Sequence, residues 1–466
     1  MTELNDLGVV DASAALRRRD ISATELTEAC LERIRSVDGT HSHDGDPDSI
    51  NAWVRVYEDD ARASAARADE LFAAGGEVPS LLGVPVGLKD LYAVAGKPIT
   101  ASSRLLTDVP TTDCDVWRRL RSAGMVLLGH LHTHEFAAGG TTDQVGNPWD
   151  LARSAGGSSG GSGAALAARM VPAATGTDTA GSLRIPSACC GTSTIKPTRN
   201  LVSTAGVVPL SWTLDHAGPM ARSLVDCRAL LAAMVGADRG RPESALHAPA
   251  HVDVPVATAP RIAISPRIVP GDLDPDVAAG FERAVEACRR LGATVVEVSP
   301  PAAGADVGDD FLDVLTTDML GYHRRFDGRR DLYRPALREW VEMGEGRGLT
   351  GADYAAAQAR RRDMTAAWAD WFDEHRLDAV IEPTIPVVAP VRGDGYEHAA
   401  SDYSLISLTH FWDWTGHPVV ALPSGIGAAT RLPVSVSLIG PAASDWALLA
   451  LGIELQAALG VPDFPR

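Results

Sequence analysis

Two stretches rich in glycine and serine are the places where this chain could do chemistry. Residues 154–163 read Ser-Ala-Gly-Gly-Ser-Ser-Gly-Gly-Ser-Gly, and residues 176–182 read Gly-Thr-Asp-Thr-Ala-Gly-Ser. The first runs into a helix-forming segment, residues 164–168, and glycines crowded before a helix are typical of backbone amides that approach another group closely. A flexible linker has the same composition and stays an alternative. A phosphate-binding loop is excluded, because no Gly-Lys-Ser or Gly-Lys-Thr follows at the required spacing.

Together with a block upstream, these stretches resemble the amidase signature family. Residues 83–90 read Gly-Val-Pro-Val-Gly-Leu-Lys-Asp, and residues 156–163 read Gly-Gly-Ser-Ser-Gly-Gly-Ser-Gly. Residues 176–186 read Gly-Thr-Asp-Thr-Ala-Gly-Ser-Leu-Arg-Ile-Pro. The three blocks occur in the family's order, and Ser158 and Ser182 are 24 positions apart, as the family has them.

The resemblance is dense from about residue 80 to 225 and continues as a recognisable pattern at 415–441. It implies an α/β fold, the amidase signature fold, with α/β/α layers around a large mixed β-sheet. It also implies hydrolysis of a C–N amide bond in a small-molecule substrate through an acyl-enzyme, without metal or organic cofactor. We expect one domain over residues 1–466, made of an N-terminal helical layer (1–78), a signature core with the catalytic residues (79–225) and a C-terminal part that completes the sheet and the substrate pocket (226–466).

Three residues match the family's catalytic triad. Lys89 matches its lysine, Ser158 the serine that follows an unusual cis peptide bond, and Ser182 the nucleophile. The chemistry is consistent with these roles, because a serine hydroxyl is a poor nucleophile until a base takes its proton. A lysine with its ordinary pKa of about 10.4 is charged, so burial or positive neighbours must lower that pKa. Ser158 would then relay protons between the other two residues.

The residues around the predicted nucleophile match the family's supporting groups. Successive amides on a tight turn converge on one point, so we expect an oxyanion hole from the backbone N–H groups of Thr179, Ala180, Gly181 and Ser182. By resemblance, Ser159 and Thr177 orient the relay, although hydrogen bonds that form turns explain them equally well. Arg184 has two interpretations, a partner of a substrate carboxylate or an ion pair with a buried acid such as Asp178.

One departure concerns the subgroup within the family. The family usually has two glycines before the nucleophile, whereas this chain has Ala180-Gly181, as some allophanate hydrolases do. The A subunit of a tRNA-dependent amidotransferase, a glutaminase, is another alternative, but that subgroup usually has Asp-Gln where this chain has Asp215-His216.

Hydrazides, carbamates and urea-like substrates fit the same mechanism. A binding protein that lost activity is a further alternative, which the presence of all three catalytic residues disfavours.

Other side chains are weaker candidates. His130, His132 and His134 alternate as metal ligands can, but no carboxylate or thiol cluster accompanies them. A Ser-His-Asp triad with Asp215 and His216 lacks a G-x-S-x-G elbow. Specificity is expected from residues 322–333 and from an aromatic group that either lines the substrate pocket or packs in the core, namely Phe411, Trp412 and Trp414.

Composition limits the partners of the chain. The formal charge of −18 argues against unaided binding to nucleic acid or to an anionic membrane. The N-terminus has no basic region followed by an apolar run, and nowhere are 18 apolar residues consecutive. We therefore expect a cytoplasmic protein that acts on a small-molecule amide, with a homodimer left open. The six cysteines are scattered without a C-x-x-C pair, which predicts buried reduced thiols.

The secondary-structure signals alternate between strands and helices, which favours an α/β layered protein. Ser22-x-x-Glu25 is a capping box, Asp274-Pro275 opens another helix, and Ser444 is the expected cap of the last helix. Further helices are expected at 60–74, 116–123 and 164–168, and strands at 81–88, 125–128, 262–264, 293–298, 379–382, 419–422 and 434–439.

Overall fold

The fold is organised around one mixed sheet of 11 strands. The computed structural model describes residues 3–236, 258–268, 271–304, 306–393 and 403–465. The strands of the main sheet are β1 (Trp53–Val56), β2 (Pro85–Lys89), β3 (Val126–Leu131), β6 (Ala173–Asp178), β7 (Ser193–Lys196), β8 (His216–Ala221), β9 (Arg261–Ile264), β10 (Thr294–Glu297), β11 (Ala379–Pro383), β12 (Val419–Ile426) and β13 (Pro433–Ile439). A separate antiparallel pair consists of β4 (Gly146–Asn147) and β5 (Asp150–Ser154).

The order of the strands is β1-β3-β2-β6-β8-β7-β12-β13-β11-β9-β10. Strand β2 lies between β3 and β6 and is parallel to both, whereas β8 is antiparallel to β6 and β7. At the other end of the sheet, β9 is parallel to β10 and β11. The prediction of a large mixed sheet is therefore confirmed. The carboxyl ends of the parallel strands β2 and β6 lie side by side, which places the residues that follow them at the same edge.

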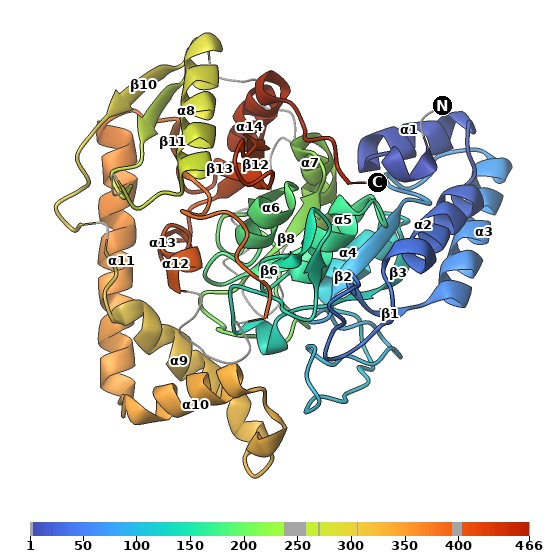
Figure 1. The fold of residues 1–466 in the computed structure, drawn as a ribbon, viewed down its shortest axis with the longest axis horizontal. Helices are drawn as coiled ribbons and strands as arrows, with labels where there is room; N and C mark the ends of the chain where they lie inside the picture. The colour runs from blue at the N-terminus through green and yellow to red at the C-terminus, as the bar shows by residue number, and fades with distance from the viewer. Residues whose placement is uncertain (1–2, 237–257, 269–270, 305, 394–402, 466) are drawn as a thin grey trace.

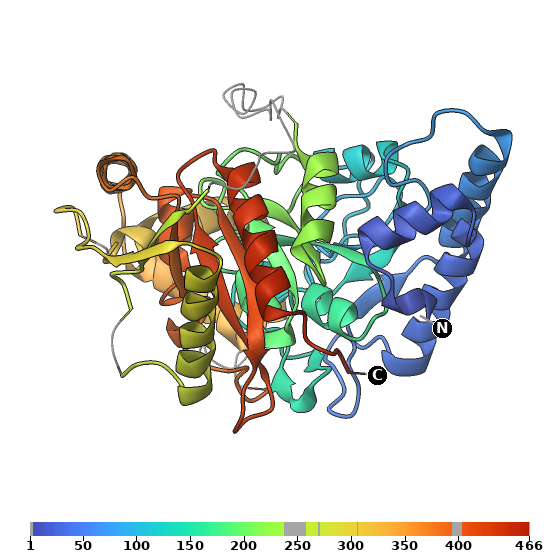
Figure 2. The same cartoon turned by 90° about the horizontal axis from the view of Figure 1, so that it is seen from above.

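Helices cover both faces of this sheet, as the predicted α/β/α arrangement requires. They are α1 (Val9–Arg18), α2 (Ala23–Val37), α3 (Glu58–Ala74), α4 (Asp115–Ser122), α5 (Gly160–Ala167), α6 (Arg184–Cys190), α7 (Leu224–Met234), α8 (Pro275–Arg290), α9 (Asp310–His323), α10 (Pro335–Gly346), α11 (Gly351–Glu374), α12 (Tyr403–Ile406), α13 (His410–Thr415) and α14 (Asp445–Leu459). Figure 1 shows α7, α8 and α14 above the sheet and α9 and α10 below it. The view from above in Figure 2 shows α8, α14 and α7 as a row of neighbours. None of the helices in the described ranges is long and apolar enough to cross a membrane.

Most of the predicted helix and strand signals are confirmed, with small shifts at the ends. Ser22 and Glu25 form the capping box of α2, and Asp274 caps α8 with Pro275 in the first turn. Ser444 occupies the predicted N-cap position of α14, but its side chain makes no capping hydrogen bond and its hydroxyl donates to the carbonyl of Pro441. All six cysteines lie in the described part of the chain, are buried and form no disulfide, as predicted.

The strand expected over 81–88 begins later, at Pro85. Gly83 has a φ of +79°, a conformation that favours glycine and turns the chain before the strand. The N–H of Leu81 donates to the carbonyl of Ala123, outside the sheet. The apolar run 81–84 is therefore a buried turn that leads into β2.

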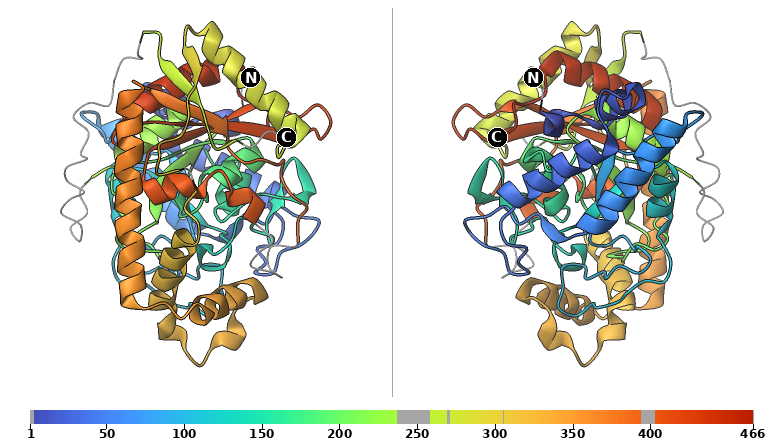
Figure 3. Two further views of the ribbon diagram at one scale, coloured as in Figure 1. Left: turned by 90° about the vertical axis from the view of Figure 1, so that its left-hand side faces the viewer. Right: turned by 90° about the vertical axis from the view of Figure 1, so that its right-hand side faces the viewer.

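Two parts of the architecture were not foreseen from the sequence. Strand β1 joins the sheet from within the N-terminal region, beside β3, and the right-hand view of Figure 3 shows α2 and α3 lying over this end of the molecule. The helices α9, α10 and α11 form a layer of their own, and the left-hand view of Figure 3 shows the length of α11 along one side. Helices α9 and α10 border the cavity described below.

Glycines in α5 allow this helix to pack closely against its neighbours. A Cβ atom at Gly161 would lie 2.5 Å from the backbone nitrogen of His132 and 2.6 Å from the carbonyl oxygen of Ala52. Backbone atoms cannot move aside as the end of a flexible side chain can. Gly346, in α10, would meet nothing within 4 Å.

We predict that Gly161→Ala lowers the free energy of unfolding by about 1–3 kcal/mol through overpacking, although alanine is the better helix former. Gly346→Ala is the matched control and should leave stability unchanged or raise it by up to about 1 kcal/mol. Urea denaturation of both variants measures the difference. Equal stability of the two variants would contradict the close packing of α5.

Candidate active site

The amine of Lys89 is buried at the carboxyl end of β2. The side chain is fully buried, and its Nζ lies 2.7 Å from Ser158 Oγ and 2.8 Å from Thr177 Oγ1. Burial lowers the pKa of Lys89 from 10.5 to about 7, although the carboxylates of Asp178 and Asp215 oppose the change. A large fraction of the amine is therefore neutral near pH 7, as a base requires.

The glycine- and serine-rich run is a buried part of the core. All residues from 154 to 163 are buried, and the run leads directly into α5. The Gly157–Ser158 peptide bond is cis, as the resemblance implied. The Ser158 carbonyl accepts hydrogen bonds from the N–H of His134 (2.9 Å) and from Thr142 Oγ1 (3.2 Å). The linker alternative is therefore wrong, because these residues hold Ser158 beside Lys89.

Ser182 lies on the turn that follows β6. Ser182 is 6% exposed, and it borders a cavity together with Thr179 and Ala180. Gly181 has a φ of +133°, and a Cβ atom there would lie 2.4 Å from Thr409 Oγ1. Only glycine fits both the backbone conformation and the space at this position.

One carboxylate, that of Asp178, shapes this turn. Its Oδ1 accepts from the N–H of Gly181 (2.5 Å), and its Oδ2 accepts from the N–H of Leu183 (3.2 Å). The expectation that four N–H groups face the substrate is therefore corrected at Gly181, whose N–H is already engaged. Within the described residues, no hydrogen bond engages the N–H groups of Thr179, Ala180 and Ser182. These three remain available to an oxyanion.

Arg184 is buried in an ion pair, away from the cavity. Its Nε and Nη2 donate to the two oxygens of Asp178 at 2.8 and 3.0 Å, and Nη2 also donates to Asp413 Oδ2 at 2.6 Å. Nη1 donates to the carbonyl of Thr409 (3.0 Å). Of the two interpretations of this residue, the ion pair with Asp178 is confirmed. With all of these donors engaged, Arg184 is not placed to bind a substrate carboxylate.

Of the two predicted orienting residues, Thr177 contacts Lys89 and Ser159 contacts Thr177. Thr177 Oγ1 accepts from Lys89 Nζ, and the Thr177 N–H and carbonyl both lie 3.4 Å from Ser159 Oγ. Ser159 therefore holds the backbone of Thr177, which in turn positions the lysine amine.

Sequence reasoning missed Asp413 and the contact that Asp215 makes with the turn. Asp413, in α13, holds Arg184, and no local pattern links two residues 229 positions apart. Asp215 accepts from Thr179 Oγ1 at 2.6 Å and from the N–H groups of Leu210 and Ser211. Burial raises the pKa of Asp215 to about 7. The position of Asp215 directly before a Gly-Pro-containing strand was visible in the sequence, but its contact with Thr179 was not.

The alternative candidates have other partners. His130 contacts Tyr57 and the carbonyl of Tyr92, His132 contacts Ser102, and His134 contacts the carbonyl of Thr141. The described residues hold no group of three or more His, Cys, Asp or Glu side chains that could bind a metal. The imidazole Nδ1 of His216 lies 3.3 Å from Asp413 Oδ1 and from the carbonyl of Asp178, so His216 is part of the buried network around Arg184.

The aromatic group of the C-terminal region packs in the core. Phe411, Trp412 and Trp414 are fully or almost fully buried, and Trp368 contacts the first two in edge-to-face geometry. None of the three is among the described residues that line the cavity at Ser182. Of their two interpretations, core packing is therefore the one observed. The expected specificity segment 322–333 also contributes no lining residue to the described part of this cavity, since Tyr322, Phe326 and Tyr333 pack around Phe136.

We predict that Arg184→Met lowers the free energy of unfolding by about 3–5 kcal/mol, because it leaves the carboxylates of Asp178 and Asp413 buried without their partner. Arg360→Met removes an exposed arginine paired with Asp310 and should change stability little. Denaturant midpoints of the two variants provide the measurement. Similar midpoints would show that the buried network is not a stabilising unit.

The chain is similar to known proteins in sequence and in fold. A family model described as Amidase matches residues 25–449. The chain is 37% identical to a protein named Amidase from Pseudomonas putida over 444 residues, which cover 91% of this chain and 90% of that protein. It is 33% identical to the A subunit of Glutamyl-tRNA(Gln) amidotransferase from Anaeromyxobacter sp. (strain K) over 494 residues, which cover 98% and 97% of the two chains. The structure of 6-aminohexanoate cyclic dimer hydrolase complexed with substrate superimposes with a TM-score of 0.84 at 28% identity, and covers 100% of this chain and 99% of that one. The chain therefore belongs to the amidase signature family and is a hydrolase of amide C–N bonds.

Proposed function

We propose that the protein hydrolyses a small-molecule amide through a covalent acyl-enzyme on Ser182, with Ser158 passing protons between Ser182 and Lys89. The observation that carries this proposal is the contact of a fully buried lysine amine, whose pKa is lowered to about 7, with Ser158 Oγ at 2.7 Å. A second supporting observation is that Ser182 borders the cavity together with Thr179 and Ala180.

The first half of the reaction forms the acyl-enzyme. Ser182 Oγ attacks the carbonyl carbon of the amide, its proton passes to Ser158 Oγ, and the proton of Ser158 passes to Lys89 Nζ. The carbonyl oxygen becomes an oxyanion, which the N–H groups of Thr179, Ala180 and Ser182 stabilise. The C–N bond then breaks as the proton returns from Lys89 through Ser158 to the leaving nitrogen.

The second half of the reaction releases the acid. A water molecule attacks the ester carbon and gives its proton through Ser158 to Lys89, and the same N–H groups stabilise the second oxyanion. The bond to Ser182 Oγ then breaks, and Ser182 recovers its proton by the same route. Hydrazides, carbamates and urea-like compounds present an equivalent carbonyl and leaving nitrogen, so this relay would act on them as well.

A second candidate function is that of a glutaminase that supplies ammonia to another protein. It is favoured by the 33% identity to the amidotransferase chain of Anaeromyxobacter over 98% of this chain. It is disfavoured by the cavity beside Ser182, because no charged side chain is among the described residues that line it. Glutamine carries an amino group and a carboxylate that would need charged partners on burial. We therefore favour the amidase.

We predict that Ser182→Ala lowers kcat by at least about 1000-fold on an unactivated amide, because it removes the covalent step. The variant should keep the denaturant midpoint of the wild type, since it loses one oxygen atom from a residue at the cavity. Intact mass after reaction with a fluorophosphonate should show one adduct on the wild type and none on the variant. An adduct on the Ser182→Ala chain, or a residual rate above about a tenth, would eliminate Ser182 as the nucleophile.

For Lys89 we predict that kcat/KM rises with pH through about 7 and then levels, because the base must be neutral and its lowered pKa is about 7. Lys89→Arg should be as inactive as Lys89→Ala, since arginine stays protonated at any usable pH.

Asp215 titrates in the same range, because burial raises its pKa to about 7, so the Asp215→Asn variant serves as the control for this profile. The rise should persist in this variant if Lys89 causes it. Loss of the rise in Asp215→Asn, or near-native activity of a folded Lys89→Arg enzyme, would refute Lys89 as the base.

A further inference from the structure

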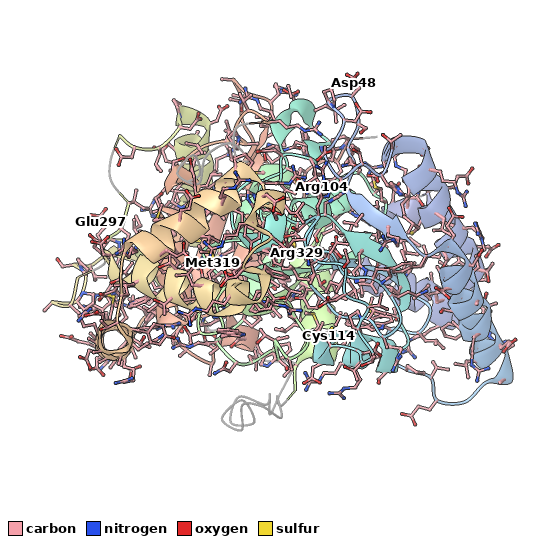
Figure 4. The ribbon with its side chains drawn as sticks, turned by 90° about the horizontal axis from the view of Figure 1, so that it is seen from below. Asp48, Arg104, Cys114, Glu297, Met319 and Arg329 are labelled. Carbon is pink, nitrogen blue, oxygen red and sulfur yellow. The ribbon has the colours of Figure 1, made fainter. Side chains whose placement is uncertain are left out.

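The cavity beside Ser182 lies next to the place where the substrate carbonyl would bind. Ser182, Thr179 and Ala180 border it on the side where the carbonyl carbon and oxygen of the substrate would lie. Leu315 and Met319 of α9 and Trp340 of α10 form part of its wall. Figure 4, the view from below, labels Met319 among the helices α9 and α10 on this side of the molecule. A carbonyl held by the N–H groups of the turn would direct one of its two substituents into this cavity.

Chemistry decides which substituent enters. The leaving nitrogen must receive a proton from the Ser158–Lys89 relay, and water must later take its place at the carbonyl carbon. An apolar wall can neither protonate an amine nor hold the attacking water. The acyl group, by contrast, stays on Ser182 through both half-reactions and gains from burial. The cavity therefore suits the acyl side of the amide.

The composition and size of the cavity restrict this acyl group. Leu210, Leu315, Met319, Trp340 and Ile406 contribute apolar surface, and no charged side chain is found among the described lining residues. The volume of the cavity is about 50 Å³, which is less than the roughly 150 Å³ of an apolar cavity that admits benzene. A short aliphatic group fits such a space, and a larger one would require Met319, an unbranched and adaptable side chain, to move.

Hydrogen bonds fix the distance between this wall and the reacting atoms. Asp318, next to Met319 on α9, accepts from Ser211 Oγ (2.6 Å) and Tyr354 OH (2.9 Å). The N–H of Ser211 donates to Asp215, which also accepts from Thr179 on the turn. The helix that carries the wall is thus connected to the turn through two buried carboxylates. A wall held in this way can discriminate between acyl groups by length.

We propose, on the basis of the function proposed above, that this cavity holds the acyl group and that the substrates are amides of compact, uncharged aliphatic acids, with Met319 setting the limit on chain length. This inference names the acyl side of the substrate. The amine side faces away from the cavity and is not restricted by it.

The test compares kcat/KM for the 4-nitroanilides of acetate, butyrate, hexanoate and γ-glutamate. In the wild type, butyrate should exceed acetate by about tenfold or more, because each buried methylene adds to binding of the transition state. The γ-glutamyl substrate should be at least about 100-fold poorer than the butyryl substrate, because its charges would be buried without partners. In Met319→Ala, the ratio of hexanoyl to butyryl rates should rise by about tenfold.

Met343→Ala is the matched control, since Met343 of α10 packs in the neighbouring core and is not among the described residues that line the cavity. It should leave the hexanoyl-to-butyryl ratio at the wild-type value. Met319→Val removes less volume and should shift the hexanoyl-to-butyryl ratio in the same direction by a smaller amount. Both rates of a ratio are measured on one preparation, so a partly folded sample does not change the ratio. A γ-glutamyl rate equal to or above the butyryl rate, or the same ratio in Met319→Ala and Met343→Ala, would overturn the inference. Neither result would refute Ser182 as nucleophile, because the fluorophosphonate adduct tests that separately.

Discussion

The proposed relay depends on keeping the buried amine of Lys89 neutral. Burial lowers its pKa to about 7, but a free carboxylate nearby would favour the charged form. The two carboxylates that act on the amine are Asp178 and Asp215, and both are engaged by other groups. Asp178 is paired with Arg184, and Asp215 accepts three hydrogen bonds while burial raises its own pKa. In the proposed relay, the amine can therefore exchange a proton with Ser158 instead of being fixed as an ammonium ion.

The same arrangement also shapes the turn at Ser182. Asp178 accepts the N–H groups of Gly181 and Leu183, so the carboxylate that is neutralised by Arg184 also sets the path of the backbone. Arg184 is held from the far side by Asp413 and by the carbonyl of Thr409, which belong to the C-terminal region. The ion pair of Asp178 with Arg184 thus sets both the charge balance and the backbone geometry of the turn. This ion pair is completed by Asp413, from the C-terminal region.

The proposed catalytic groups and the cavity wall come from different parts of the chain. Lys89, Ser158 and Ser182 lie on β2, before α5 and after β6, where parallel strands bring their carboxyl ends together. The wall comes from α9 and α10, outside the sheet. A framework of this kind can keep one reaction while the wall changes, because the wall and the proposed catalytic groups lie on different elements.

The sequence alone determined the family, the mixed sheet, several helix starts and the candidate triad, because these depend on local patterns. The capping box at Ser22 and Pro275 after Asp274 act within a few residues, and the three signature blocks are contiguous. The structure decided what depends on residues far apart in the chain. The pairing of Arg184 with Asp413, the use of the Gly181 N–H by Asp178 and the apolar wall of α9 and α10 are of this kind. The aromatic group at 411–414 shows why, since burial in the core and exposure to a cavity require the same residue types, and only tertiary packing distinguishes them.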